Sequence, residues 1–163
     1  MIYAGTGHRL NVLGPEGEEE NTHLKVTRFA KSILPTYNPT KVISGMAIGW
    51  DTAIALAALE NNIPLVAAVP FVGQESMWPQ LAKDRYHEIL RNCVEVVIVC
   101  EGGYAGWKYH ERDKWMIYNS ETMIALYNGH PKGGTAATVR YAKQANRELF
   151  NVWPGWEQFE VAA

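Results

Sequence analysis

The sequence has few cysteines, no long apolar run and no cluster of basic residues. Cys93 and Cys100 do not have the C-x-x-C spacing of a zinc or redox pair, so we expect two buried, inert thiols, as in a reducing cytosol. No apolar stretch approaches the roughly 20 residues that a membrane helix requires, and the N-terminus lacks the pattern of a secretory signal. We therefore expect a cytoplasmic protein with no membrane association.

The charge balance excludes one large class of partner. The net charge is -2, from 15 Lys and Arg against 17 Asp and Glu, whereas a protein that holds duplex DNA needs clustered cations. A small anionic ligand needs only one or two cations and some backbone N–H groups, so it is favoured over single-stranded nucleic acid. With 163 residues, 47% of them hydrophobic, the chain is expected to form one domain, residues 1–163.

Apolar runs typical of strands alternate with segments that have helical periodicity. This alternation predicts an α/β protein, a Rossmann-like three-layer sandwich with a mostly parallel central sheet. Because strands buried on both faces read as continuous apolar runs, residues 94–99 are expected at the centre of the sheet. Pro35 is expected to end the first helix, and residues 153–163 to form a short C-terminal tail. The expected strands are 2–4, 41–44, 65–69, 94–99, 122–127 and 148–152, and the expected helices are 22–34, 50–61, 78–92, 111–119 and 135–145.

Glycine-rich or polar segments follow five of these strands, and in a parallel sheet they share the edge where ligands bind. In the last of them, Gly133 and Gly134 allow close approach of the backbone to an anion, and Thr135 is expected at a helix N-cap. The free N–H groups of that helix and its positive dipole end would suit a phosphate. The alternative is an ordinary Gly-Gly turn with a threonine cap, and we weigh the two equally.

The first two segments offer polar side chains. Arg9, which follows Gly5-Thr6-Gly7-His8, has a planar fork for phosphate or carboxylate, against the alternative of a surface ion pair with a glutamate. His8 is favoured as a structural histidine bonded to backbone rather than as an acid or base. After Ser44-Gly45-Met46, Asp51 could bind a ribose or base, but an acid that complements the helix dipole is somewhat favoured.

A dense aromatic segment, residues 104–118, separates the fourth and fifth strands. We rank core and subunit interface first for it, and base stacking second, because Tyr, Trp and Arg are enriched at interfaces. We therefore expect a homo-oligomer, most simply a dimer. No metal site and no cofactor is indicated, because the histidines are scattered and no P-loop lysine or G-x-S-x-G elbow is present.

Taken in order, the motifs resemble those of the SMF/DprA–LOG (SLOG) superfamily, and most closely its YspA/YpsA-like branch. The matching pieces run over most of the chain: Thr6-Gly7-His8-Arg9, Ile43 to Asp51, Pro70-Phe71 with Gln74 and Trp78, Arg112 to Met116, Ala125-Leu126-Tyr127, Gly133-Gly134-Thr135 and Tyr141-Ala142. The resemblance implies a Rossmann-like fold and a nucleotide-derived ligand at the strand ends, with Gln74 and Arg112 among the site residues. Some relatives cleave a base from a ribose 5′-phosphate, and others bind single-stranded DNA or sense nucleotides.

Two positions depart from the pattern of the related hydrolases. Thr138 stands where their loop carries a catalytic Glu, and Asp113 stands where the branch usually shows Asn. The missing Glu argues against phosphoribohydrolase activity. The favoured function is therefore binding or sensing of a nucleotide-like ligand. The runner-up is a nucleoside 5′-monophosphate N-glycosidase, with Asp51 and Glu101 as the acids at strand ends. A third hypothesis is an interaction protein with a vestigial pocket.

Overall fold

The computed structural model describes residues 1–162 and has a single six-stranded sheet at its centre. All neighbouring strands are parallel, in the order β4-β3-β2-β1-β5-β6. The strands are β1 (Ile2–Gly7), β2 (Lys41–Ser44), β3 (Leu65–Val69), β4 (Glu95–Ile98), β5 (Thr122–Leu126) and β6 (Glu148–Asn151). The predicted α/β class and parallel sheet are confirmed.

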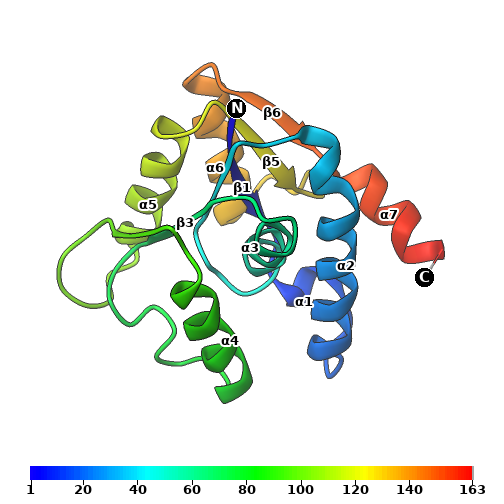
Figure 1. The fold of residues 1–163 in the computed structure, drawn as a ribbon, viewed down its shortest axis with the longest axis horizontal. Coiled ribbons are helices and arrows are strands. Elements are labelled where there is room, and N and C mark those ends of the chain that lie inside the picture. The colour runs from blue at the N-terminus through cyan, green and yellow to red at the C-terminus, as the bar shows by residue number, and fades with distance from the viewer. Residues whose placement is uncertain (163) are drawn as a thin grey trace.

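Helices cover both faces of the sheet, which makes the three layers of a Rossmann-like sandwich (Figure 1). On one face, α2, α3, α4 and α7 build a large core with the side chains of β1, β2 and β3; on the other, α5 and α6 build a smaller one. The helices are α1 (Leu10–Leu13), α2 (Glu19–Tyr37), α3 (Trp50–Glu60), α4 (Gln80–Arg91), α5 (Trp107–Tyr118), α6 (Gly134–Gln144) and α7 (Trp153–Ala162). No helix in residues 1–162 is both long and apolar enough to cross a membrane.

Strand β1 is longer than expected and runs through Gly5, Thr6 and Gly7, so these residues belong to the sheet and not to a loop. Helix α3 crosses very close to them. A Cβ at Gly7 would lie 2.6 Å from Cδ1 of Trp50, and one at Gly5 would lie 3.0 Å from Cγ2 of Ile54. Because Gly5 and Gly7 have no side chains, α3 can pack closely against β1. This packing places the N-terminus of α3 beside the end of β1.

The expectation that residues 94–99 lie at the centre of the sheet is wrong. Strand β4 is an edge strand that pairs only with β3, while β1 and β2 occupy the centre. Val96 and Ile98 are 42% and 44% exposed. After β4 the chain crosses to the far side of β1 through α5, so no strand in residues 1–162 covers that edge.

The expected C-terminal tail is instead a helix that completes the core. Trp156 of α7 is only 1% exposed, and its ring centroid lies 5.6 Å from that of Phe29 on α2. Figure 1 shows α7 alongside α2, at the red end of the chain. Ala163, the last residue of the expected tail, lies outside the described residues.

Three smaller expectations also fail. Pro35 does not end the first helix, because α2 continues to Tyr37 and ends with Asn38 in the left-handed conformation. Proline disturbs the turn that precedes it and not the residues that follow it, so the two residues after Pro35 can still complete the last turn of α2. Thr135 is not an N-cap, since Gly133 takes that position and α6 starts at Gly134. Cys93 and Cys100 are free thiols but only half-buried, and burial raises the pKa of Cys93 to about 11.

Candidate functional site

A cavity of about 770 Å³ opens at the carboxyl ends of β1, β2 and β5. The connection from β1 leads towards β2, whereas β5 continues to β6 on the opposite side. The crevice between β1 and β5 is therefore a topological switch point, the place where open α/β sheets bind their ligands. Three of the five predicted segments, those after β1, β2 and β5, contribute to the cavity, and α1 and α5 supply further parts of its wall.

The segment after β5 forms the most open part of the wall. Gly133 has a φ of +103°, and neither a Cβ at Gly133 nor one at Gly134 would meet any atom within 4 Å. Helix α6 begins at Gly134, so its first-turn N–H groups have no acceptor within the helix. Free space, free N–H groups and a positive dipole end thus meet at the cavity wall, as an anion site requires.

Arg112 lies on the cavity wall although its side chain is buried. Its Nη1 donates to the carbonyl of Gly45 at 2.6 Å, and its Nε donates to Oδ1 of Asp113 at 2.8 Å. The same carbonyl accepts a bond from Nε2 of Gln74 at 3.2 Å. The Gly45 carbonyl and the Asp113 carboxylate therefore hold Arg112 in place, and the guanidinium has further N–H groups with which to bind an anion.

Asp51 lines the cavity from the first turn of α3. Its Oδ2 accepts a bond from the N–H of Ala47 at 3.3 Å, and its own carbonyl accepts one from Oγ of Ser44 at 2.7 Å. Burial raises the pKa of Asp51 to about 6, although the nearby Arg112 acts in the opposite direction. The carboxyl is thus poised to change its charge close to neutral pH.

His8 joins the ends of the two strands at the switch point. Its Nε2 accepts a bond from the N–H of Asn128 at 3.0 Å, which is the structural role favoured for it. Burial lowers the pKa of His8, so the ring is neutral and able to accept this bond. Arg9 is exposed at the cavity wall and forms no ion pair within residues 1–159, the part of the chain whose side chains the structure describes, so a surface pair with a nearby glutamate is not seen there.

The two departures from the hydrolase pattern touch each other. Oγ1 of Thr138 on α6 lies 2.9 Å from Oδ2 of Asp113 on α5 and 3.0 Å from the carbonyl of Gly134. Both residues line the cavity. A carboxylate is therefore present beside the position of the missing Glu, but it comes from the neighbouring helix.

The predicted site residues divide into a lining group and a supporting group. The cavity is lined by Gly5, Thr6, Gly7, His8, Arg9, Asp51, Arg112, Gly133, Gly134 and Thr135. Ser44, Gly45, Met46 and Gln74 lie behind this wall, where they support Arg112 and Asp51. Glu101 is exposed on the loop after β4 and does not line the cavity, so the structure does not bring this candidate acid together with Asp51.

Sequence reasoning missed part of the lining. Tyr109 faces the cavity from the first turns of α5, and the Arg112 guanidinium carbon lies 5.9 Å from its ring centroid. The aromatic segment was ranked first as core and interface, yet Tyr109 is the member that could stack against a base. Asn128 was also missed, because nothing in its local sequence shows that it meets His8 across the sheet.

Positively charged side chains outnumber carboxylates in the lining of the cavity. Arg9, Arg112 and Lys132 place three cations around it, against the carboxylates of Asp51 and Asp113. In the part of the chain that the structure describes, no three His, Cys, Asp or Glu side chains gather as metal ligands.

Comparison with known proteins bears on the family and on the fold. The chain is 27% identical over 155 residues to the SPbeta prophage-derived protein YoqJ of Bacillus subtilis, covering 84% of this chain and 90% of that protein. It is 25% identical over 107 residues to a UPF0398 protein of Brevibacillus brevis, covering 63% of this chain and 57% of the relative.

Two solved structures share the fold. One is the DNA processing protein A (DprA) of Streptococcus pneumoniae, with a TM-score of 0.65 and 20% identity over 92% of this chain and 49% of that one. The other is the molybdenum cofactor carrier protein of Chlamydomonas reinhardtii, with a TM-score of 0.56 and 17% identity over 97% of this chain and 80% of that one. The chain thus spans about half the length of DprA and just over half of the UPF0398 relative.

A family model decides the membership. The model of DNA recombination-mediator protein A matches residues 18–162, which include all the helices and strands after α1. This match agrees with the motifs that resemble the SMF/DprA–LOG superfamily. The chain belongs to the DNA recombination-mediator protein A family.

Proposed function

We propose that this protein binds a nucleotide or a nucleotide-derived ligand in the cavity between β1 and β5, and that it does not catalyse a reaction of that ligand. The observation that carries the proposal is the open, glycine-lined N-terminus of α6 facing Arg9 and Arg112 across one cavity. A phosphate would accept bonds from the first-turn N–H groups of α6, and a base would stack on Tyr109. The volume of about 770 Å³ lies in the range of small-molecule sites.

The names of the two structural neighbours fit this proposal without narrowing it. One neighbour processes DNA and the other carries the molybdenum cofactor. A small ligand is the better fit to this chain because its net charge is -2. Long single strands would need a basic track along the surface.

The first test is calorimetric titration of the protein with a panel of nucleoside 5′-monophosphates. In a second test, each nucleotide is incubated with the protein and, as a control, without it, and the free base released is measured. We expect binding of at least one nucleotide and no base release above the control. If no nucleotide binds at millimolar concentrations, the proposal fails.

A second candidate function, the N-glycosidase, is favoured by one observation. Asp113 holds a carboxylate beside Thr138, where the related hydrolases have their Glu, and Asp51 supplies a second acid with a raised pKa. This activity would be established if the wild type releases free base and if Asp113→Asn or Asp51→Asn lowers the rate of release by about a hundredfold or more while nucleotide affinity is preserved.

A further inference from the structure

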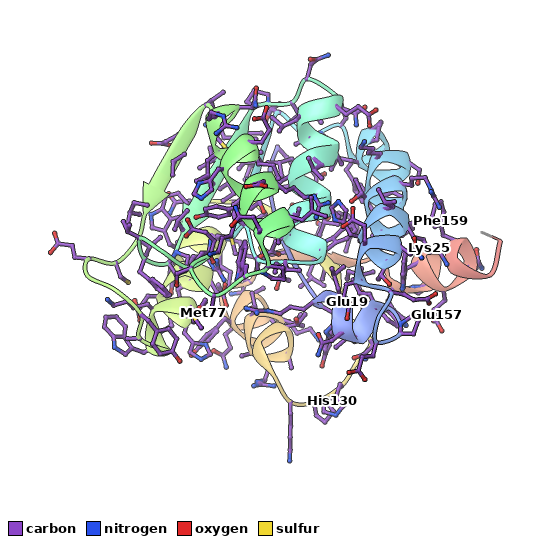
Figure 2. The ribbon with its side chains drawn as sticks, turned by 90° about the horizontal axis from the view of Figure 1, so that it is seen from below. Glu19, Lys25, Met77, His130, Glu157 and Phe159 are labelled. Atoms are coloured by element: carbon purple, nitrogen blue, oxygen red, sulfur yellow. The ribbon has the colours of Figure 1, made fainter. Side chains whose placement is uncertain are left out.

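A second cavity, of about 540 Å³, lies on the other side of Arg9. It is enclosed by α1, the first turns of α2, the start of α3 and the N-terminal half of α4. Glu19, labelled in Figure 2, lies at the N-terminal end of α2 and is among the residues that line this cavity. We call this space the α2–α4 cavity.

One polar side chain in the wall of the α2–α4 cavity lacks a partner. His23 of α2 is only 5% exposed, and no hydrogen bond joins its ring to another residue among those whose side chains the structure describes, 1–159, yet its ring nitrogens are not sealed from the cavity. Because these nitrogens form no bond within the protein, their hydrogen-bonding capacity is directed to whatever occupies the cavity. His23 lines the cavity, so a molecule bound there could provide the missing partner.

The charge state of His23 limits what that molecule can be. Burial, and after it the charge of Arg85, lowers the pKa of His23 to about 4, while Glu20 acts in the opposite direction and Lys31 in the same one. At neutral pH the ring is therefore uncharged, with one N–H donor and one nitrogen acceptor. Such a group has no preference for an anion and pairs well with a neutral ring that carries both a donor and an acceptor.

The rest of the wall is apolar or balanced in charge. Trp78, Leu81 and Ile48 provide apolar surface, and the Trp78 ring is held edge-on against Tyr86, with centroids 5.3 Å apart. Arg85 and Glu20 neutralise each other through two bonds, of 2.8 and 3.1 Å, that join α4 to α2. In contrast with the first cavity, nothing here concentrates positive charge.

We infer that the α2–α4 cavity is a second binding site, which takes a planar, uncharged heteroaromatic group that hydrogen-bonds to His23 and packs against Trp78. Aromatic rings fit this wall because they bury a large area and pack against an indole in specific geometries. The inference does not depend on what the first cavity binds.

The experiment uses benzimidazole, uncharged at neutral pH, and indene, a fused ring of similar size without nitrogen. Each is titrated into the full chain while the indole N–H signals of the tryptophans are followed by NMR. We expect benzimidazole to shift the Trp78 signal, assigned with Trp78→Phe, in a saturable way and more tightly than indene. Absence of saturation at millimolar concentrations, or saturable shifts confined to indole signals other than that of Trp78, would overturn the inference.

Variants locate the site. His23→Phe replaces an unpartnered ring with an apolar one of similar size, so the fold is retained and benzimidazole affinity falls about three- to tenfold, the value of one neutral hydrogen bond. His87→Phe is the matched control, because His87 lies on α4 with its side chain 50% exposed, outside the cavity. Equal affinity in His23→Phe and in the wild type would contradict the assignment.

Leu81→Asp keeps the test decisive if His23→Phe fails to fold. Leu81 is 57% exposed in the first turn of α4, where an acid is well tolerated. The added charge on the apolar wall should abolish benzimidazole binding. Unchanged benzimidazole binding in this variant would place the probe elsewhere and refute the proposal.

Discussion

At the scale of single residues, the glycines near the first cavity serve two different purposes. Gly5 and Gly7 are crowded by Ile54 and Trp50 of α3, whereas Gly133 and Gly134 face open space. Substitution at the first pair should therefore disturb folding, and substitution at the second pair should disturb ligand binding. This contrast separates residues that build the site from residues that meet the ligand.

The first prediction uses Gly134→Val. Its side chain meets no atom of the protein but enters the approach path of an anion at the N-terminus of α6, so nucleotide affinity should fall by about tenfold or more while thermal stability changes little. Gly103→Val is the matched control, since Gly103 also has no neighbour within 4 Å and lies outside the cavity. Unchanged affinity in folded Gly134→Val would remove this loop from the site.

A second prediction concerns Arg9, which is exposed and free of ion pairs in the described chain. Arg9→Ala should weaken nucleotide binding by about 1.5–3 kcal/mol, the scale of a charged hydrogen bond. Arg9→Lys should recover only part of this loss, because the fork of the guanidinium is missing. Calorimetric titration measures both values, and two neutral results would exclude Arg9 from the phosphate contacts.

The raised pKa of Asp51 predicts how anion binding depends on pH. Above its pKa of about 6 the carboxyl is charged and repels an anion, and below it the carboxyl is neutral, so sulfate should bind more tightly as the pH falls through 6. An effect of about threefold to tenfold is expected for one charge at such a site. Sulfate is the probe because its own charge does not change over this range.

Asp51→Asn is the control for this pH dependence. Histidines also line the cavity and contribute to any pH effect, so only the difference between wild type and variant reports on Asp51. The variant should bind sulfate more tightly above pH 6 and show a flatter profile. Identical profiles would mean that Asp51 does not influence the anion.

At the scale of elements, α7 is the clearest case of a helix whose role depends on a distant partner. Trp156 is buried among Phe29 of α2 and Phe159 of its own helix. Figure 2 labels Phe159 beside α2, which agrees with this packing. Helix α7 thus completes the larger hydrophobic core, which lies on the face of the sheet that α2 and α3 also cover.

Removing the Trp156 side chain should therefore destabilise the whole protein. Trp156→Ala is expected to lower the free energy of unfolding by about 3–5 kcal/mol, because it leaves a large cavity in the core. Trp107→Ala, at a position 60% exposed on α5, should cost far less. Urea denaturation compares the two, and similar losses would show that α7 is not part of the cooperative core.

These elements also show how far the sequence alone leads. Strands β2 and β3 were predicted with their observed bounds because they are short apolar runs between turn signals. Helix α7 was missed because the sequence Trp153-Pro154-Gly155 has low helix propensity and was read as an irregular tail. The packing of Trp156 against Phe29 of α2 becomes apparent only in the folded structure. The lining glycines could be predicted from their position after strands, but Asn128 and Tyr109 are brought to the cavity by tertiary packing alone.

At the scale of the whole molecule, exposed apolar surface gathers around one edge. Strand β4 exposes Val96 and Ile98, and the adjoining loop and helix expose Tyr104 and Trp107. The edge position of β4 could not be read from its composition, because the crossovers between strands set the strand order. Proteins that expose such a surface commonly bury it against a partner.

A homodimer therefore remains our prediction for the protein in solution. Light scattering should give a mass about twice the 18.3 kDa of one chain, since closed dimers are the commonest assembly. Tyr104→Ser combined with Trp107→Ser, which replaces residues 78% and 60% exposed, should shift the mass towards that of a monomer. A monomer mass for the wild type at high concentration would contradict the prediction.

Arg9 lines both the first cavity and the α2–α4 cavity, and one guanidinium cannot adopt two positions at once. A phosphate that draws Arg9 towards α6 changes the wall that a ring meets beside His23. Thermodynamic linkage then makes the effect reciprocal: whatever factor one ligand imposes on the affinity of the second, the second imposes on the first. A single side chain would thus couple ligand binding at the two cavities, and in Arg9→Ala the affinity at each cavity would no longer depend on occupancy of the other.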